Sequence, residues 1–95
     1  MILSFGDKTT GDLFNGIGSK GTRPFQSILK VVRRKLDMIN TATRLGDLMS
    51  PPNNRLELLK GDLKGFHSIR VNDQYRIIFM WQNGNAHEVR ITDYN

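Results

Sequence analysis

Apolar residues in the first half of the chain recur at helical spacing. Residues 2–5 form a short β-prone run that can pair only as an edge or joining strand, residues 7–14 have room for one or two helical turns, and residues 16–21 are glycine-rich and predict a loop. From position 24 onward the apolar side chains recur every three or four positions, as in an amphipathic helix that covers a core. They are Phe25, Ile28, Leu29, Val32, Leu36 and Ile39. We expect Thr22 to cap this helix and Pro24 to occupy its first turn.

The second half of the chain alternates apolar and polar residues with the period of two that is typical of strands. After Pro51 and Pro52, which forbid continuation of a helix, the pattern predicts four strands, at residues 55–59, 66–71, 75–81 and 86–92. Short turn sequences separate them, so neighbouring strands should form antiparallel hairpins. The sequence therefore predicts an α+β fold, a single domain over residues 1–95 in which two or three helices cover one face of an antiparallel sheet.

Strand alternation assigns a different chemistry to each face of this sheet. The apolar face should hold Leu56, Leu58, Ile69, Val71, Ile77, Phe79, Val89 and Ile91. The same parity places on the opposite face Glu57, Ser68, Arg70, Arg76, Glu88 and Arg90. Arginine presents a fixed fork of donors that suits phosphate oxygens, so this face is a candidate anion site. The alternative is a set of cross-strand Arg–Glu pairs without function. On an exposed face, loss of Arg76 should barely change stability.

Two further groups of residues have a functional and a structural interpretation. The polar face of the predicted helix carries Lys30, Arg33 and Arg34, which either form a solvated surface or bind an RNA backbone. His67 and His87 fall by alternation on the apolar side of the sheet. We therefore expect packed or hydrogen-bonded histidines there and not catalytic ones.

Composition narrows the classes of protein and of partner. Fourteen Lys and Arg against nine Asp and Glu give a net charge of +5 and an isoelectric point near 10.0, which favours a polyanionic partner without identifying it. The chain has no cysteine and only two widely spaced histidines, so we predict no metal site and no cofactor. No apolar run approaches the ~18 residues of a membrane span, and no signal peptide is evident, so we expect a cytoplasmic protein that does not bind membranes.

Several separated segments, in order along nearly the whole chain, resemble the HigB branch of the RelE superfamily. The strongest likeness is in the run from Ser50 to Asp62, in the run from His67 to Ile77 and in the closing Asp93-Tyr94. The opening residues 2–5 and the helical residues 34–39 also resemble that family. The resemblance implies a small twisted antiparallel sheet, RelE-like, with two helices on one face and RNA on the other.

The same resemblance implies an activity and a set of partners. Proteins of this family are toxins of type II toxin–antitoxin systems and act as metal-independent endoribonucleases that cut messenger RNA on the ribosome. A cognate HigA-like helix-turn-helix antitoxin neutralises the toxin, and the toxin meets operator DNA only through that antitoxin. Two other interpretations stay open: a catalytically impaired or non-catalytic RNA-binding protein that blocks translation, and a module that only engages its antitoxin.

Position by position, the resemblance implies a catalytic group made of Lys60, Arg76, Asp93 and Tyr94, with Asn95 at the closing position. Metal-free RNA cleavage needs deprotonation of a 2′-hydroxyl, stabilisation of the phosphorane charge and protonation of the leaving oxygen. We assign charge stabilisation to Arg76 and Lys60, orientation or proton transfer to Asp93, and base stacking or positioning to Tyr94. An unperturbed lysine, with a pKa of ~10.4, is a poor base at neutral pH.

The resemblance also marks residues at which the match is weaker. The family typically ends with histidine, and this chain has Asn95, an amide that cannot exchange protons near neutral pH. Some relatives have histidine where this chain has Glu57, which we keep as a secondary RNA-binding residue. Arg70 is a further RNA-binding candidate on the same face, together with Lys30, Arg33 and Arg34 on the helix.

Overall fold

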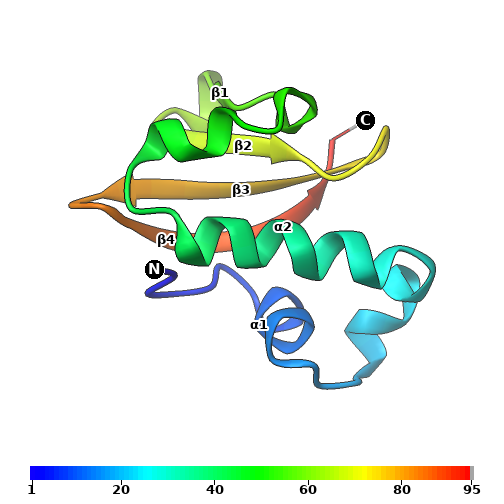
Figure 1. The fold of residues 1–95 in the computed structure, drawn as a ribbon. Helices are drawn as coiled ribbons and strands as arrows, with labels where there is room; N and C mark the ends of the chain where they lie inside the picture. The colour runs from blue at the N-terminus through cyan, green and yellow to red at the C-terminus, as the bar shows by residue number, and fades with distance from the viewer. Residues whose placement is uncertain (95) are drawn as a thin grey trace.

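The computed structural model describes residues 1–94 and places two α-helices on one side of a four-stranded sheet (Figure 1). The helices are α1, Lys8–Asn15, and α2, Leu29–Thr41. The strands are β1, Glu57–Leu58, β2, Phe66–Arg70, β3, Tyr75–Gln82, and β4, Asn85–Asp93. They follow the order β1-β2-β3-β4 with every pair antiparallel, so the predicted meander and the α+β class are confirmed.

Helix α1 is held at both ends and at its middle. The Asp7 carboxylate accepts a hydrogen bond from the Thr10 backbone amide at 2.8 Å, which satisfies a free donor of the first turn. Gly16 ends the helix in the left-handed conformation, with φ of 73°, which costs glycine no steric strain. The buried Thr10 hydroxyl accepts from the Ile91 amide at 2.9 Å and so joins α1 to β4.

The segment that leads into α2 differs from the expectation. Thr22 and Pro24 lie inside a 3₁₀ helix, Lys20–Ile28, and the α-helix begins only at Leu29. The proposed cap at Thr22 is therefore wrong, although its hydroxyl does accept from the Ser19 amide at 3.0 Å. Proline lacks a backbone donor and disfavours the α conformation of the residue before it, which suits this tighter entry. No helix within residues 1–94 is long and apolar enough to cross a membrane.

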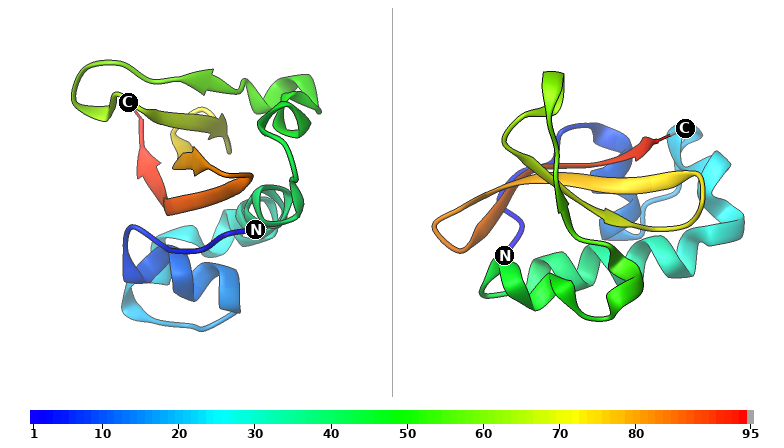
Figure 2. Two further views of the ribbon diagram at one scale, coloured as in Figure 1. Left: turned by 90° about the vertical axis from the view of Figure 1, so that its left-hand side faces the viewer. Right: turned by 90° about the horizontal axis from the view of Figure 1, so that it is seen from above.

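The core lies between α2 and the helix-facing side of the sheet. Helix α2 buries Val32, Leu36 and Ile39 completely. The sheet contributes Ile69, Val71, Ile77, Phe79, Val89 and Ile91, as alternation predicted. Leu58 was expected there and is instead 60% exposed, because the two-residue strand β1 lies on the far side of β2 from α2 (Figures 1 and 2). Helix α2 also buries Lys35, a charged residue at a core position.

A bulge in β4 overturns two assignments to the sheet faces. Phe79 of β3 stands opposite an extra residue of β4, and Glu88 there has a φ of 55°. Beyond the bulge His87 pairs with Met80, so His87 shares the face of Arg76 and not the apolar side. The Glu88 carboxylate contacts the Ser4 hydroxyl at 3.3 Å, in the N-terminal segment that pairs parallel to β4, and so faces the sheet edge rather than the arginines.

Candidate functional site

Arg76, in the middle of the sheet face that the helices leave uncovered, is the centre of the candidate site. Its side chain is only 9% exposed. Its Nε donates to the Ser68 hydroxyl at 2.8 Å, and its Nη2 donates to the Arg55 carbonyl at 2.6 Å. The same Nη2 lies 3.2 Å from the Glu57 carboxylate. Contacts from three segments therefore fix the plane of the guanidinium group.

An aromatic ring covers this guanidinium group. The ring centroid of Tyr94 lies 5.1 Å from the Arg76 Cζ atom, within the range of a cation–π contact. The Tyr94 amide donates to the Gln74 carbonyl at 2.8 Å, which ties the end of β4 to the β2–β3 turn. The tyrosine is 46% exposed, so the ring presents a free surface to solvent. We call Glu57, Ser68, Arg76 and Tyr94 the Arg76 site.

The geometry of the Arg76 site suits a phosphate. Within residues 1–94 the hydrogen bonds and the ion pair that hold the Arg76 guanidinium group use its Nε and Nη2 atoms, which leaves the Nη1 donors for an anion. Arginine is permanently charged and its donors lie in one plane, so a guanidinium whose orientation is already fixed can meet phosphate oxygens with little reorganisation. An exposed tyrosine ring beside it offers a stacking surface to a base.

Two other predicted residues lie beside the site through strand pairing. Arg70 stands directly opposite Arg76 in the β2–β3 ladder, and its guanidinium group is paired with the carboxylate of Asp73 in the following turn. Asp93 stands opposite Tyr75 at the end of β4, and its carboxylate accepts from the Gln74 side-chain amide at 3.1 Å. Both side chains are therefore held at the same end of the sheet as Arg76.

Of the last two residues predicted to be catalytic, only Lys60 lies among the described residues. Lys60 is exposed and immediately precedes the 3₁₀ turn Gly61–Leu63, and no hydrogen bond or ion pair between described residues joins it to Arg76. Asn95 lies outside the described residues.

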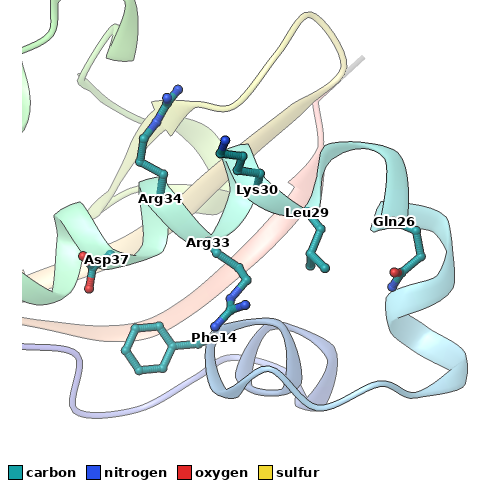
Figure 3. Close-up of a pocket in the computed structure, with 7 residues that line it drawn as sticks. All are labelled: Phe14, Gln26, Leu29, Lys30, Arg33, Arg34 and Asp37. Atoms are coloured by element: carbon teal, nitrogen blue, oxygen red, sulfur yellow. The ribbon is translucent and has the colours of Figure 1, made fainter.

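The basic residues of α2 occupy the other side of the molecule. Lys30, Arg33 and Arg34 line a hollow of about 640 Å³, which we call the α2 groove (Figure 3). The other residues that line it are Phe14, Gln26, Leu29 and Asp37. Arg33 points toward α1, whereas Lys30 and Arg34 point away from it (Figure 3). Within residues 1–94 none of the three cations has an ion-pair partner, and the buried face of α2 separates them from the Arg76 site.

His67 lies on the core side, as the sequence predicted. Its ring stacks on Phe79 at 6.2 Å between centroids, and its Nδ1 atom is buried without a hydrogen-bond partner among the described residues. Burial lowers the pKa of His67 below its ordinary value of 6.5. We conclude that His67 is a packed, neutral histidine on the face of the sheet away from Arg76.

Sequence reasoning placed Ser68 on the correct face but gave it no role, and it did not find the Arg55 carbonyl. Ser68 is fully buried, so its hydroxyl is a fixed partner for Arg76. The alternation that placed both residues on one face was a signal that they could touch. No side-chain pattern could reveal the carbonyl, because any residue supplies one.

Comparison with known proteins identifies the family. A family model described as the RelE-like toxin of the type II toxin–antitoxin system HigB matches residues 4–94. The chain belongs to this family. A protein of Vibrio cholerae named Toxin HigB-1 is 43% identical over 86 residues, which are 90% of each chain. A protein of Proteus vulgaris named Endoribonuclease HigB is 37% identical over 95 residues, the whole length of both chains.

The fold has a counterpart among solved structures. The YoeB–YefM complex from Staphylococcus aureus contains a chain that matches with a TM-score of 0.61 and 14% identity, over 100% of this chain and 98% of that one. At that identity the likeness supports the fold alone. The family expected from the sequence is thus confirmed: the chain is a HigB-like toxin of a type II toxin–antitoxin system, a class of toxin that pairs with an antitoxin.

Proposed function

We propose that this HigB-like toxin is a ribosome-dependent messenger RNA endonuclease whose reaction centre is the Arg76 site. The observation that carries the proposal is a buried guanidinium group, fixed by Ser68, the Arg55 carbonyl and Glu57, that keeps Nη1 for an anion beside an exposed tyrosine. Such a group stabilises charge where it develops in the transition state. The relative from Proteus vulgaris named an endoribonuclease supports the same reaction class.

The proposed reaction is an attack by the ribose 2′-hydroxyl on the adjacent phosphate. The 2′-oxygen forms a bond to phosphorus as it loses its proton, the bond from phosphorus to the 5′-oxygen breaks, and that oxygen gains a proton. The products are a 2′,3′-cyclic phosphate and a 5′-hydroxyl end. Arg76 stabilises the phosphorane and Tyr94 stacks on a base. The two exposed carboxylates, Glu57 and Asp93, are the groups near Arg76 that can hold or move a proton.

Lys60 and the ribosome complete the site in this proposal. Lys60 is exposed on the loop after β1, and bound RNA would bring a phosphate between its ammonium group and Arg76. Among the described residues Lys60 has no hydrogen bond or ion pair with Arg76, so in this proposal a surface that aligns the messenger RNA supplies part of the orientation. Positioning of this kind can lower a barrier by several kcal/mol. The decoding site of the ribosome provides such a surface.

The α2 groove is the second contact in this proposal. Lys30, Arg33 and Arg34 lie on the opposite side of the sheet from Arg76, so they bind ribosomal RNA backbone and not the cleaved codon. Arg70, beside Arg76, binds the messenger RNA. A protein that meets RNA on two faces acts in the cytoplasm, where ribosomes are found. A HigA-like helix-turn-helix antitoxin holds it inactive and brings it to operator DNA.

Mapping of new 5′ ends tests the proposal. RNA from cells that express the toxin, or its Arg76→Ala variant, is mapped for a message with and without its start codon. The proposal expects ends with a 5′-hydroxyl inside translated codons, for the parent chain and the translated message only. Ends of equal abundance in the untranslated message, or with the Arg76 variant, would overturn it.

A second candidate function rests on Asn95. An amide at the position where the family has histidine cannot exchange protons, which favours a toxin that occupies the ribosome without cutting. In the same experiment this second function gives arrested protein synthesis without new 5′ ends.

A further inference from the structure

Helix α2 buries a lysine at a position where the helical pattern requires an apolar residue. Lys35 is 3% exposed and lies between Val32 and Leu36 on the face that packs on the sheet. No carboxylate of the described residues forms an ion pair with it. Burial lowers its pKa, and the charges of Arg34 and Arg70 lower it further. A buried ammonium group without a counterion is costly, so its contact with another residue needs an explanation.

That contact is the side chain of Asn54. The Lys35 ammonium group donates to the Asn54 Oδ1 atom, and Asn54 is completely buried. The Asn54 Nδ2 group donates in turn to the carbonyls of Leu48, at 3.2 Å, and Ser50, at 3.3 Å. One amide therefore connects helix α2 to the segment that runs from Leu48 to the start of β1.

The next residue along the chain meets Arg76. Asn54 ends the 3₁₀ turn Pro52–Asn54, and Arg55 then adopts a φ of 46°, which is uncommon for a residue with a Cβ atom. The Arg55 amide donates to the Pro52 carbonyl at 3.1 Å, and the Arg55 carbonyl accepts from Arg76 Nη2 at 2.6 Å. The direction of that carbonyl depends on the turn that Asn54 holds in place.

We propose that Lys35 and Asn54 are positioning residues for Arg76. Lys35 anchors the Asn54 amide, the amide fixes the turn, and the turn directs the Arg55 carbonyl at the Arg76 guanidinium group. The proposal rests on the proposed role of Arg76 and extends it to the opposite, helix-covered side of the sheet. It gives the buried charge a function, because a hydrocarbon side chain at position 35 would pack equally well but could not hold the Asn54 oxygen.

The test compares Lys35→Met with a matched core variant, Ile39→Val. Cleavage of a codon on programmed ribosomes is measured as kcat and KM, together with the urea midpoint of each variant. We expect Lys35→Met to lower kcat about tenfold with KM within twofold of the parent, and Lys35→Arg, which keeps a charged donor, to recover most of that loss. The Ile39→Val variant should lower only the urea midpoint. Unchanged kcat in folded Lys35→Met would overturn the proposal.

Two further measurements separate this proposal from the proposed function. If Lys35 acts through Arg76, then Lys35→Met adds no loss of cleavage to Arg76→Ala, whereas multiplied losses overturn the positioning role. Cleavage by Arg76→Ala at the parent's rate would instead overturn the role of Arg76 itself. The second measurement does not depend on cleavage activity. The Arg76 Nε–H signal in ¹H–¹⁵N spectra should shift or broaden in Lys35→Met and stay unchanged in Ile39→Val.

The variant Asn54→Asp keeps the test decisive if Lys35→Met does not fold. It retains an acceptor for Lys35, now as an ion pair, but loses both donors to the carbonyls of Leu48 and Ser50. We expect a folded protein with a shifted Arg76 Nε–H signal and a lowered kcat. A parental signal and parental kcat in this variant would show that the turn holds its shape without the Asn54 amide, and would overturn the proposal.

Discussion

The Arg76 site and the α2 groove carry the same kind of charge but are built in different ways. Arg76 is nearly buried, and three partners determine where its guanidinium group lies. Lys30, Arg33 and Arg34 are exposed, and no ion pair with a described residue holds any of them. A cation held in one place can stabilise the charge that develops at one point in a transition state. Mobile cations on a surface instead raise the affinity for a polyanion. The two regions should therefore respond differently to substitution.

The largest expected effect is that of Arg76→Ala. We expect cleavage to fall by about 10²–10³-fold, the range typical of removing one charge-stabilising donor. The fold should also lose roughly 1–3 kcal/mol, because the buried Ser68 hydroxyl and the Arg55 carbonyl are left without a partner. Strand alternation alone placed Arg76 on an exposed face and so predicted almost no loss of stability. The burial of Arg76 revises that expectation. Cleavage on programmed ribosomes and urea denaturation measure the two quantities.

Arg76→Lys serves as the control, since it keeps the charge and loses the planar fork. If the lysine variant cleaves as fast as the parent, charge alone suffices and the contrast between the two regions disappears.

Asn95→His should raise cleavage by about 10²-fold, the lower end of what acid–base catalysis contributes. Histidine, with an unperturbed pKa of ~6.5, can accept and return a proton at physiological pH, whereas asparagine cannot. The rate on programmed ribosomes is compared for both chains, with Lys60→Ala in each background. Equal rates would show that the closing histidine is dispensable and would leave Lys60, Asp93 and Tyr94 to carry the proton transfers. No cleavage by either chain would favour the non-catalytic function.

Neutralising the α2 groove should have a moderate effect on affinity and none on chemistry. The double variant Arg33→Gln with Arg34→Gln should bind ribosomes more weakly, and its log–log slope of affinity against salt should fall by roughly 0.7–0.9 for each lost phosphate contact. Cleavage at saturating ribosomes should not change. Arg44→Gln, in the loop after α2, is the control for loss of one positive charge outside the groove. A slope identical to the parent's would make the groove a solvated surface.

The smallest effect concerns His67 and the pH dependence of stability. Burial lowers the pKa of His67 below 6.5, so the folded protein binds a proton less readily than the unfolded chain. The contribution of the neutral His67 to the free energy of unfolding should therefore be fully present above about pH 6.5. It should decrease as the pH falls below that value. Urea denaturation between pH 5 and 8 measures it, and His67→Phe should flatten the profile. A profile that keeps its slope in His67→Phe would show that the titrating group is not His67.

Alternation along the strands predicted the sheet well, because period-two patterns report directly which side chains are buried. Six of the eight residues assigned to the core face are buried there. The β4 bulge was not foreseen, since Glu88 has no sequence feature that demands a positive φ. His87 was therefore assigned to the wrong side.

The candidate site was predicted in part. Alternation placed Glu57, Ser68 and Arg76 on one face of the sheet. It predicts the face on which a side chain lies but not how deeply that side chain is buried. Lys35 was overlooked because a lysine in a helical pattern is counted as polar, and only the buried amide of Asn54 explains its position. The catalytic assignments of Lys60 and Asn95 came from family resemblance and stay predictions.

The pairing of the N-terminal segment with β4 means that the fold cannot be completed until the last strand has been made. The Leu3 amide donates to Ala86, Thr10 accepts from Ile91, and Tyr94 covers Arg76. The first two contacts join residues made early to residues made late, so a nascent chain that lacks β4 has neither these hydrogen bonds nor a covered guanidinium group. If the Arg76 site acts as proposed, we expect such a chain to be inactive until its last strand has emerged.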